Sequence, residues 1–217
     1  MKKVIIILAA VAHISCSGQI NITNQLYMIP LKVGENAPIQ FETLVIEPVN
    51  LFVQSKPWND RSPHIQLELN VKRNSGEYAT FLWYYETDSD PKTNYPKAFE
   101  NYIFGLEINN DSVRLAVEKL DFGKDFFLEL NQKAIIGNIS ISFKEYYIKW
   151  YVHPFGEPNG HCAIYVIEVS GGNEQEEIIF RFYSDDRLNE LQSEWKGYQF
   201  SLVEAGEKIF KLKVLEK

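Results

Sequence analysis

The chain has 217 residues, with 22 Lys and Arg against 29 Asp and Glu, which gives a formal net charge of −7. This acidic balance excludes the broad basic face that sequence-independent binding of nucleic acid requires. Two cysteines exclude both a multi-disulfide scaffold and a four-cysteine zinc site. A hydrophobic content of 45% predicts a packed core, and an aromatic content of 14% favours β-structure.

The first residues have the order of an export signal. Two lysines precede an unbroken apolar run from Val4 to Ala12. This run is shorter than the roughly 20 residues of a membrane-spanning helix, but it suits the apolar region of a signal peptide. The sequence HISCSG at 13–18 resembles the lipobox of bacterial lipoproteins, in which a small residue precedes a cysteine that becomes the lipidated N-terminus.

This resemblance implies a signal peptide over residues 1–15, a lipid anchor on Cys16 and a tether over 16–30. The protein is then exported and held on a membrane of the bacterial cell envelope, on its periplasmic or outer side. Two alternatives stay open at this point. One is ordinary signal-peptidase cleavage after Ala12 or Gly18, and the other is a cytosolic protein with an apolar first strand.

The rest of the chain resembles itself at an offset of 96 to 98 residues. Matching segments occur six times in the same order, which predicts an internal duplication with one unit over 31–122 and a second over 123–217. The clearest matches pair Phe41 to Val53 with Ile139 to Tyr151, and His64 to Leu69 with His161 to Val166.

Apolar and polar residues alternate in most of these segments, and this pattern predicts strands. Ile65, Leu67, Leu69 and Val71 share one face, and turn signals such as 109–111 recur every 8 to 12 residues. The predicted fold is therefore all-β, with two tandem antiparallel β-sandwich units of Ig-like or Greek-key type. The sequence does not distinguish two abutting sandwiches from one long sandwich with pseudo-twofold symmetry.

A short helical insertion is predicted in each unit. In the second unit, Ser184 to Asp186 can cap a helix in which Leu188, Leu191 and Trp195 share a face. In the first unit, Asp90 and Pro91 offer a cap, and Pro96 restricts the structure that follows to a turn over 97–101.

The strongest candidate for chemistry is the segment from His153 to Cys162. Two imidazoles, on His153 and His161, and the Cys162 thiol flank a turn-rich loop, so that they could converge on zinc or copper. The same residues could form a Cys–His nucleophile, although a cysteine on a strand lacks the usual activating helix N-terminus. The competing interpretation is that both histidines lie on the rim and that Cys162 packs as a small apolar residue.

Two further features suggest binding instead of catalysis. Trp58 lies between prolines and polar residues, where an exposed ring can stack on a sugar or contact a protein, whereas Trp83, Trp150 and Trp195 are predicted in the core. The acidic stretches 86–90 and 185–186 could bind Ca²⁺ or merely cap turns.

No nucleophile elbow, P-loop or zinc-protease motif is present in the sequence. The leading hypothesis is therefore a non-catalytic, cofactor-free binding or structural protein of the envelope, with a protein or glycan partner. The alternative is a metal-binding or metal-dependent protein that uses His153, His161 and Cys162. A third possibility is a hydrolase with carboxylates that are scattered along the sequence.

Overall fold

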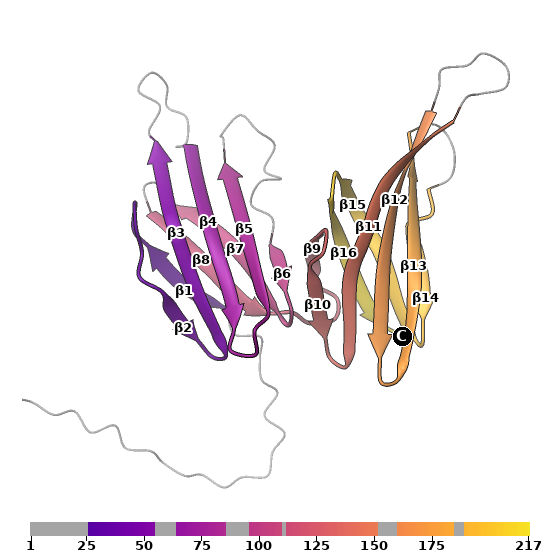
Figure 1. Cartoon of the computed structure of the whole chain (residues 1–217), viewed down its shortest axis with the longest axis horizontal. Coiled ribbons are helices and arrows are strands. Elements are labelled where there is room, and N and C mark those ends of the chain that lie inside the picture. The colour runs from indigo at the N-terminus through magenta and orange to yellow at the C-terminus, as the bar shows by residue number, and fades with distance from the viewer. Residues whose placement is uncertain (1–25, 55–63, 86–95, 110–111, 152–159, 185–188) are drawn as a thin grey trace, which may run out of the picture.

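The computed structural model describes residues 26–54, 64–85, 96–109, 112–151, 160–184 and 189–217. This part of the chain is all-β and β-sandwich-like (Figure 1). Its first eight strands are β1 (Tyr27–Leu31), β2 (Ile39–Phe41), β3 (Leu44–Gln54), β4 (His64–Arg73), β5 (Tyr78–Tyr85), β6 (Lys97–Phe99), β7 (Tyr102–Asn109) and β8 (Ser112–Lys119). The next eight are β9 (Asp125–Glu129), β10 (Lys133–Ile136), β11 (Ile139–Tyr151), β12 (Gly160–Gly171), β13 (Glu174–Tyr183), β14 (Gln192–Trp195), β15 (Tyr198–Gly206) and β16 (Ile209–Glu216).

The strands form three sheets. One has eight strands in the order β1-β8-β7-β6-β9-β16-β15-β14, and the other two have the orders β2-β3-β4-β5 and β10-β11-β12-β13. Adding eight to each strand number of the first half reproduces the order of the second half. The two halves of the chain therefore have the same strand connections.

Local irregularities recur at the same places in both halves. Each strand that follows the first short hairpin has a bulge, at Val49 in β3 and at Lys144 in β11. Residues with positive φ also recur 95 to 97 positions apart, in the pairs Gly34 and Asn131, Glu42 and Gly137, Gly76 and Gly172, and Glu100 and Lys196. A bulge and a left-handed residue each fix the direction of the chain locally, so the repeat extends from topology to backbone conformation.

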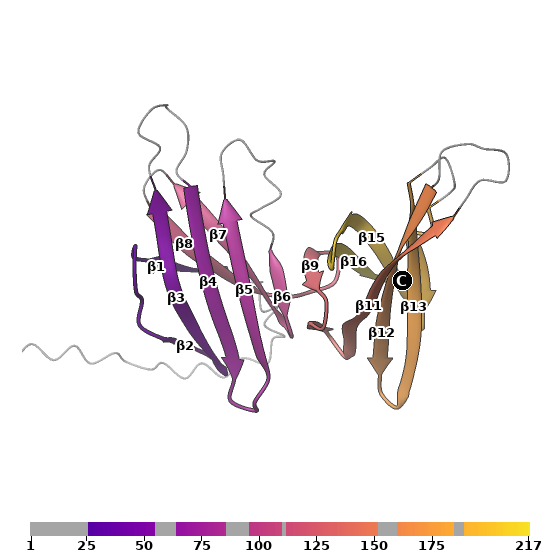
Figure 2. The same cartoon turned by 45° about the horizontal axis from the view of Figure 1, so that its top comes forward.

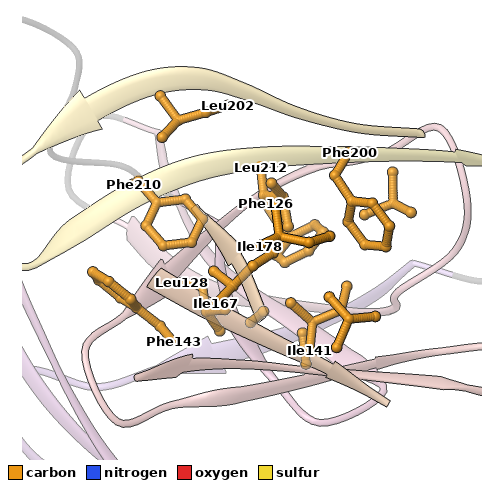
Figure 3. Close-up of a cluster of buried hydrophobic side chains, with 14 of the residues drawn as sticks. Phe126, Leu128, Ile141, Phe143, Ile167, Ile178, Phe200, Leu202, Phe210 and Leu212 are labelled. Atoms are coloured by element: carbon orange, nitrogen blue, oxygen red, sulfur yellow. The ribbon is translucent and has the colours of Figure 1, made fainter. Parts of the chain in front are cut away.

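Each half has its own hydrophobic core. The first gathers residues such as Leu67, Phe81 and Leu115, and the second gathers residues such as Phe143, Phe200 and Phe210. Figure 3 shows aromatic and aliphatic side chains of β9, β11, β15 and β16 meeting in the second core. These residues occupy the alternate, inward-facing positions of their strands, and their side chains fill the space between two sheets.

The eight-stranded sheet belongs to both cores. Its halves meet where β6 pairs with β9 in parallel, Lys97 opposite Phe127, whereas the other strand pairs described are antiparallel (Figure 2). Phe99 of β6 packs in the first core, and its neighbour Ala98, which is 1% exposed, packs in the second. Because neighbouring side chains of a strand point to opposite faces, the two cores lie on opposite faces of one sheet.

A buried lysine links the two halves at this junction. The Lys97 side chain is 8% exposed, and its Nζ donates to the Leu82 carbonyl oxygen at 2.8 Å. The same Nζ lies 2.5 Å from Glu129 Oε1 on β9 and 5.3 Å from the centre of the Trp83 ring. A charge in such a position is stable only when it is paired, so Lys97 couples β5 of the first half to β9 of the second.

Neither predicted helical insertion is seen among the residues that the structure describes. Glu190 forms a backbone bridge with Arg181, and residues 192–195 form β14, while residues 185–188 lie outside the described part. An extended chain lets the Trp195 ring pack against Gly171, where an added Cβ would lie 3.2 Å from it. In the first half, Lys97–Phe99 is strand β6 instead of a turn, and the segment 86–95 is not described.

The start of the folded part also differs from expectation. Strand β1 begins at Tyr27, within the stretch predicted as tether, and it pairs with β8 over its whole length. Residues 1–25 lie outside the described part. Among the residues described, no helix of membrane-spanning length is found.

Replacing Lys97 tests the junction. We expect Lys97→Ala to lower the free energy of unfolding by about 2–3 kcal/mol, because it leaves the Leu82 carbonyl and Glu129 without their buried partner. Lys97→Met, which keeps the apolar stem, should lower it less. The control is Lys72→Ala, which removes an exposed ion pair with Glu47 and should cost at most about 1 kcal/mol. Equal urea midpoints for Lys97→Ala and the control would contradict a structural role for Lys97.

Candidate functional site

The structure describes two of the five residues singled out from the sequence. Cys16, Trp58 and His153 lie outside the described residues. His161 and Cys162 lie at the beginning of β12. Of the predicted set of His153, His161 and Cys162, the structure places the last two.

The geometry of β12 turns His161 and Cys162 away from each other. They are consecutive residues of a strand, so their side chains point to opposite faces of the sheet. His161 lies opposite Trp150 of β11, with 5.1 Å between the ring centres, whereas Cys162 lies opposite Lys149 and Tyr183. No group of three His, Cys, Asp or Glu side chains that could hold a metal occurs among the residues with described positions.

The Cys162 thiol is buried on the outer face of the second four-stranded sheet. It packs with Ile164 and Val166, and Tyr183 lies alongside. Burial raises the pKa of the Cys162 thiol, against a weaker opposing effect of its hydrogen bond with Tyr183. A raised pKa reduces the thiolate fraction at neutral pH, and the thiolate is both the nucleophile and the metal ligand. Burial and the raised pKa both favour low reactivity of the thiol, in a position typical of a small apolar residue.

The other face of the same strands carries an exposed apolar surface. Trp150 is 72% exposed, Ile148 is 41% exposed and Phe182 is 38% exposed. Strand register aligns Ile148, Ala163 and Phe182 across β11, β12 and β13, with Trp150 and His161 as the next pair. Ala163 is buried, and we call the other four residues, Ile148, Trp150, His161 and Phe182, the overhang surface.

The overhang surface exists because the two sheets of the second half differ in length. Tyr165, next to Ala163 on the same face of β12, donates a hydrogen bond of 2.9 Å to the carbonyl of Gly206 at the end of β15. The facing sheet turns back there, from β15 to β16. Strands β11 and β12 continue beyond that level (Figure 1), and the core-side residues on their continuation have no facing strand from β15 or β16.

The local chain is held firmly at the overhang surface. The backbone amide of His161 donates to Ser184 Oγ at 2.9 Å, and the Ser184 amide donates to the His161 carbonyl at 3.0 Å. These hydrogen bonds connect the beginning of β12 to the residue that follows β13. The aromatic and aliphatic groups are therefore presented on a sheet, which positions a contact surface more rigidly than a loop does.

A depression lies between the end of β9 and the turn from β15 to β16. It is lined by Glu129, Leu130, Asn131, Glu207, Lys208 and Ile209. It is shallow and open to solvent. The Glu129 carboxylate is already paired with Lys97, and the Leu130 amide donates to the Lys208 carbonyl at 2.9 Å. Its main polar groups are thus used in holding the fold, and the overhang surface is the better candidate for a contact site.

The prediction for the tryptophans was right in two cases and wrong in one. Trp83 and Trp195 are buried, as expected, whereas Trp150 is exposed. The alternating pattern does place Trp150 on the core-facing side, in the same row as Ile148. The pattern carries no information on where the opposing sheet ends, and this determines the exposure of the ring.

No family model matches the chain, and no curated protein matches its sequence. The interpretation of the site therefore depends on its geometry.

The position of Cys162 predicts its reactivity. In the folded protein the thiol should react with a disulfide reagent at pH 8 at least about tenfold more slowly than in urea, because burial both blocks access and raises the thiol pKa. The pH dependence should be shifted upward relative to a free cysteine. The measurement uses Cys16→Ser protein, so that Cys162 alone reacts. A native thiol as fast as the unfolded one would restore Cys162 as a candidate for chemistry.

Proposed function

We propose that this protein is a non-catalytic binding protein of the bacterial cell envelope, exported and anchored by a lipid on Cys16, with a protein or glycan partner. The single observation that carries the binding role is the overhang surface, with Trp150 at 72% exposure beside Ile148 and Phe182. Exposed aromatic groups that are held by a sheet are typical of contact surfaces for proteins and sugars. Export and anchoring rest on the lipobox resemblance at 13–18.

We also infer that the chain arose by internal duplication of one eight-stranded β-sandwich unit. The support is the identical strand order of the two halves, the bulges at Val49 and Lys144, and the recurring positive-φ residues. Duplication explains why the second half could acquire a contact surface while the first half kept the same architecture.

The arrangement of the two halves suits this function. Strand β1, where the chain enters the fold from the proposed tether, lies near one end of the long axis, and the ends of β11 and β12 lie near the other (Figure 1). An anchor before β1 would therefore leave the overhang surface on the side away from the membrane. Spacing of this kind is useful when the partner lies beyond the membrane surface.

Replacing Trp150 tests the binding role. We expect Trp150→Ala to weaken binding by about tenfold or more, because the most exposed aromatic group of a contact surface can contribute much of its binding energy. The matched control is Tyr147→Ala, which removes an exposed aromatic residue from the opposite face of the same strand and should leave binding within about twofold.

Binding is measured with immobilised envelope polysaccharides and, separately, with envelope proteins that are crosslinked to the purified chain and identified. A polysaccharide that retains the wild type but not Trp150→Ala is a glycan partner. An envelope protein that crosslinks to the wild type but not to Trp150→Ala is a protein partner. Equal losses for Trp150→Ala and the control would contradict a role for the overhang surface.

The anchor has its own test. The intact mass of the protein from a bacterial host with a working lipoprotein pathway should correspond to a chain that starts at an acylated Cys16. Cys16→Ser should abolish the added mass and release the protein from the membrane fraction. A lipid-free mass that starts at residue 13 or 19 would contradict anchoring without affecting the test of Trp150.

A further inference from the structure

The two outer edges of the eight-stranded sheet correspond to the two edges that meet inside it. Strand β1 ends the sheet on one side and β14 ends it on the other, and strand order makes them the counterparts of β9 and β6. Strands β9 and β6 are paired with each other at the internal junction. The two end strands, β14 and β1, therefore correspond to the two strands, β6 and β9, that pair with each other inside the sheet.

Three backbone hydrogen bonds define the internal junction. The Phe127 amide donates to the Pro96 carbonyl at 2.9 Å. Beyond β6, the Glu100 amide donates to the Lys133 carbonyl, and the Ile135 amide donates to the Glu100 carbonyl, both at 2.8 Å. Glu100 makes these bonds from a left-handed conformation with φ of 48°. Between them, the small side chain of Ala98 enters the second core.

The edge of β1 lacks the first of these donors. Phe127 of β9 is paired with Lys211 of β16, and the matching pair in the first half is Pro30 with Arg114. Pro30 therefore occupies the position of Phe127. Proline has no amide hydrogen, so β1 cannot make the bond that Phe127 makes to Pro96. A proline at a sheet edge is a recognised obstacle to the addition of a further strand.

The edge of β14 carries the second obstacle. Phe99 is paired with Tyr102, and Trp195 is paired with Tyr198, so Glu194 is the counterpart of Ala98. Glu194 is exposed and forms an ion pair with Lys217. If β14 were paired as β6 is, the Glu194 carboxylate would be forced into an apolar core, at a large cost in free energy.

The backbone beside this obstacle still has the geometry of the junction. Lys196, the counterpart of Glu100, has φ of 47°. Among the described residues, no backbone hydrogen bond outside the strand ladders involves the amide or the carbonyl of Lys196. Lys196 thus keeps the left-handed conformation in which Glu100 bonds to β10, whereas the side chain of Glu194 differs from that of Ala98.

We propose that β14 and β1 form a latent head-to-tail interface between copies of this chain, and that Pro30 and Glu194 keep it closed. The occupant that fits each edge is a second copy, because the internal junction shows how β6 receives β9. Such an interface joins two different surfaces, so it would propagate into linear chains if it were opened. With both obstacles present, the protein stays a single two-unit molecule.

The experiment removes both obstacles at once. Sedimentation compares the wild type with Pro30→Val/Glu194→Ala, both carrying Cys16→Ser so that no lipid drives association. The wild type should stay monomeric, and the double variant should form head-to-tail oligomers with an association at least about tenfold stronger than that of the wild type. Either single variant should associate less than the double variant.

The control is Pro30→Val/Glu176→Ala, which has the same proline replacement and the same change in charge but leaves β14 intact; Glu176 is an exposed residue of β13. Circular dichroism confirms folding, and Pro30→Ala/Glu194→Gln replaces the double variant if that one does not fold. A folded double variant that stays monomeric would overturn the proposal. Equal association of the control, or association of the wild type itself, would overturn it as well.

Discussion

The parallel pairing of β6 with β9 is the constraint on which the rest of the architecture depends. Strand β6 has only three residues, and its alternating side chains enter different cores, Phe99 the first and Ala98 the second. Strand β6 can pack in both cores only when the two halves keep a fixed position relative to each other. The buried charge of Lys97 strengthens this requirement, because its partners come from β5 and from β9. The junction therefore joins the two halves through one continuous eight-stranded sheet.

The all-β character could be predicted from the sequence because strand patterns and turn signals are local. Turn signals and alternating patterns such as Ile65 to Val71 need no knowledge of distant residues. The helix over 184–195 failed because its few apolar residues also fit an extended chain. Contact between Trp195 and Gly171 decides between the two, and Gly171 is distant in sequence. The join between the halves was equally out of reach, since it depends on a single parallel pair.

The candidate site shows the same limit from another side. The sequence analysis allowed His161 and Cys162 to converge on one site, whereas their placement as consecutive residues of one strand turns their side chains to opposite faces. The exposure of Trp150 could not be predicted in this way. Its row of the sheet is the core-facing row, and among the described strands β15 and β16 turn back near Gly206 and do not face it. Strand length, a property of the partner sheet, turned a core position into a contact position.

Repetition also explains why the ends of the sheet need different side chains from its middle. Under the proposed duplication, each unit carries both halves of the junction, and two of the four edges, β1 and β14, end the sheet in the described part of the chain. An inherited edge that kept the sequence of β6 or β9 would accept further copies and grow without limit. The molecule retains the left-handed backbone at Lys196 but has Pro30 and Glu194 where the internal junction has Phe127 and Ala98. The backbone of the repeat is thus preserved, while the side chains at its free edges distinguish the end of the molecule from its centre.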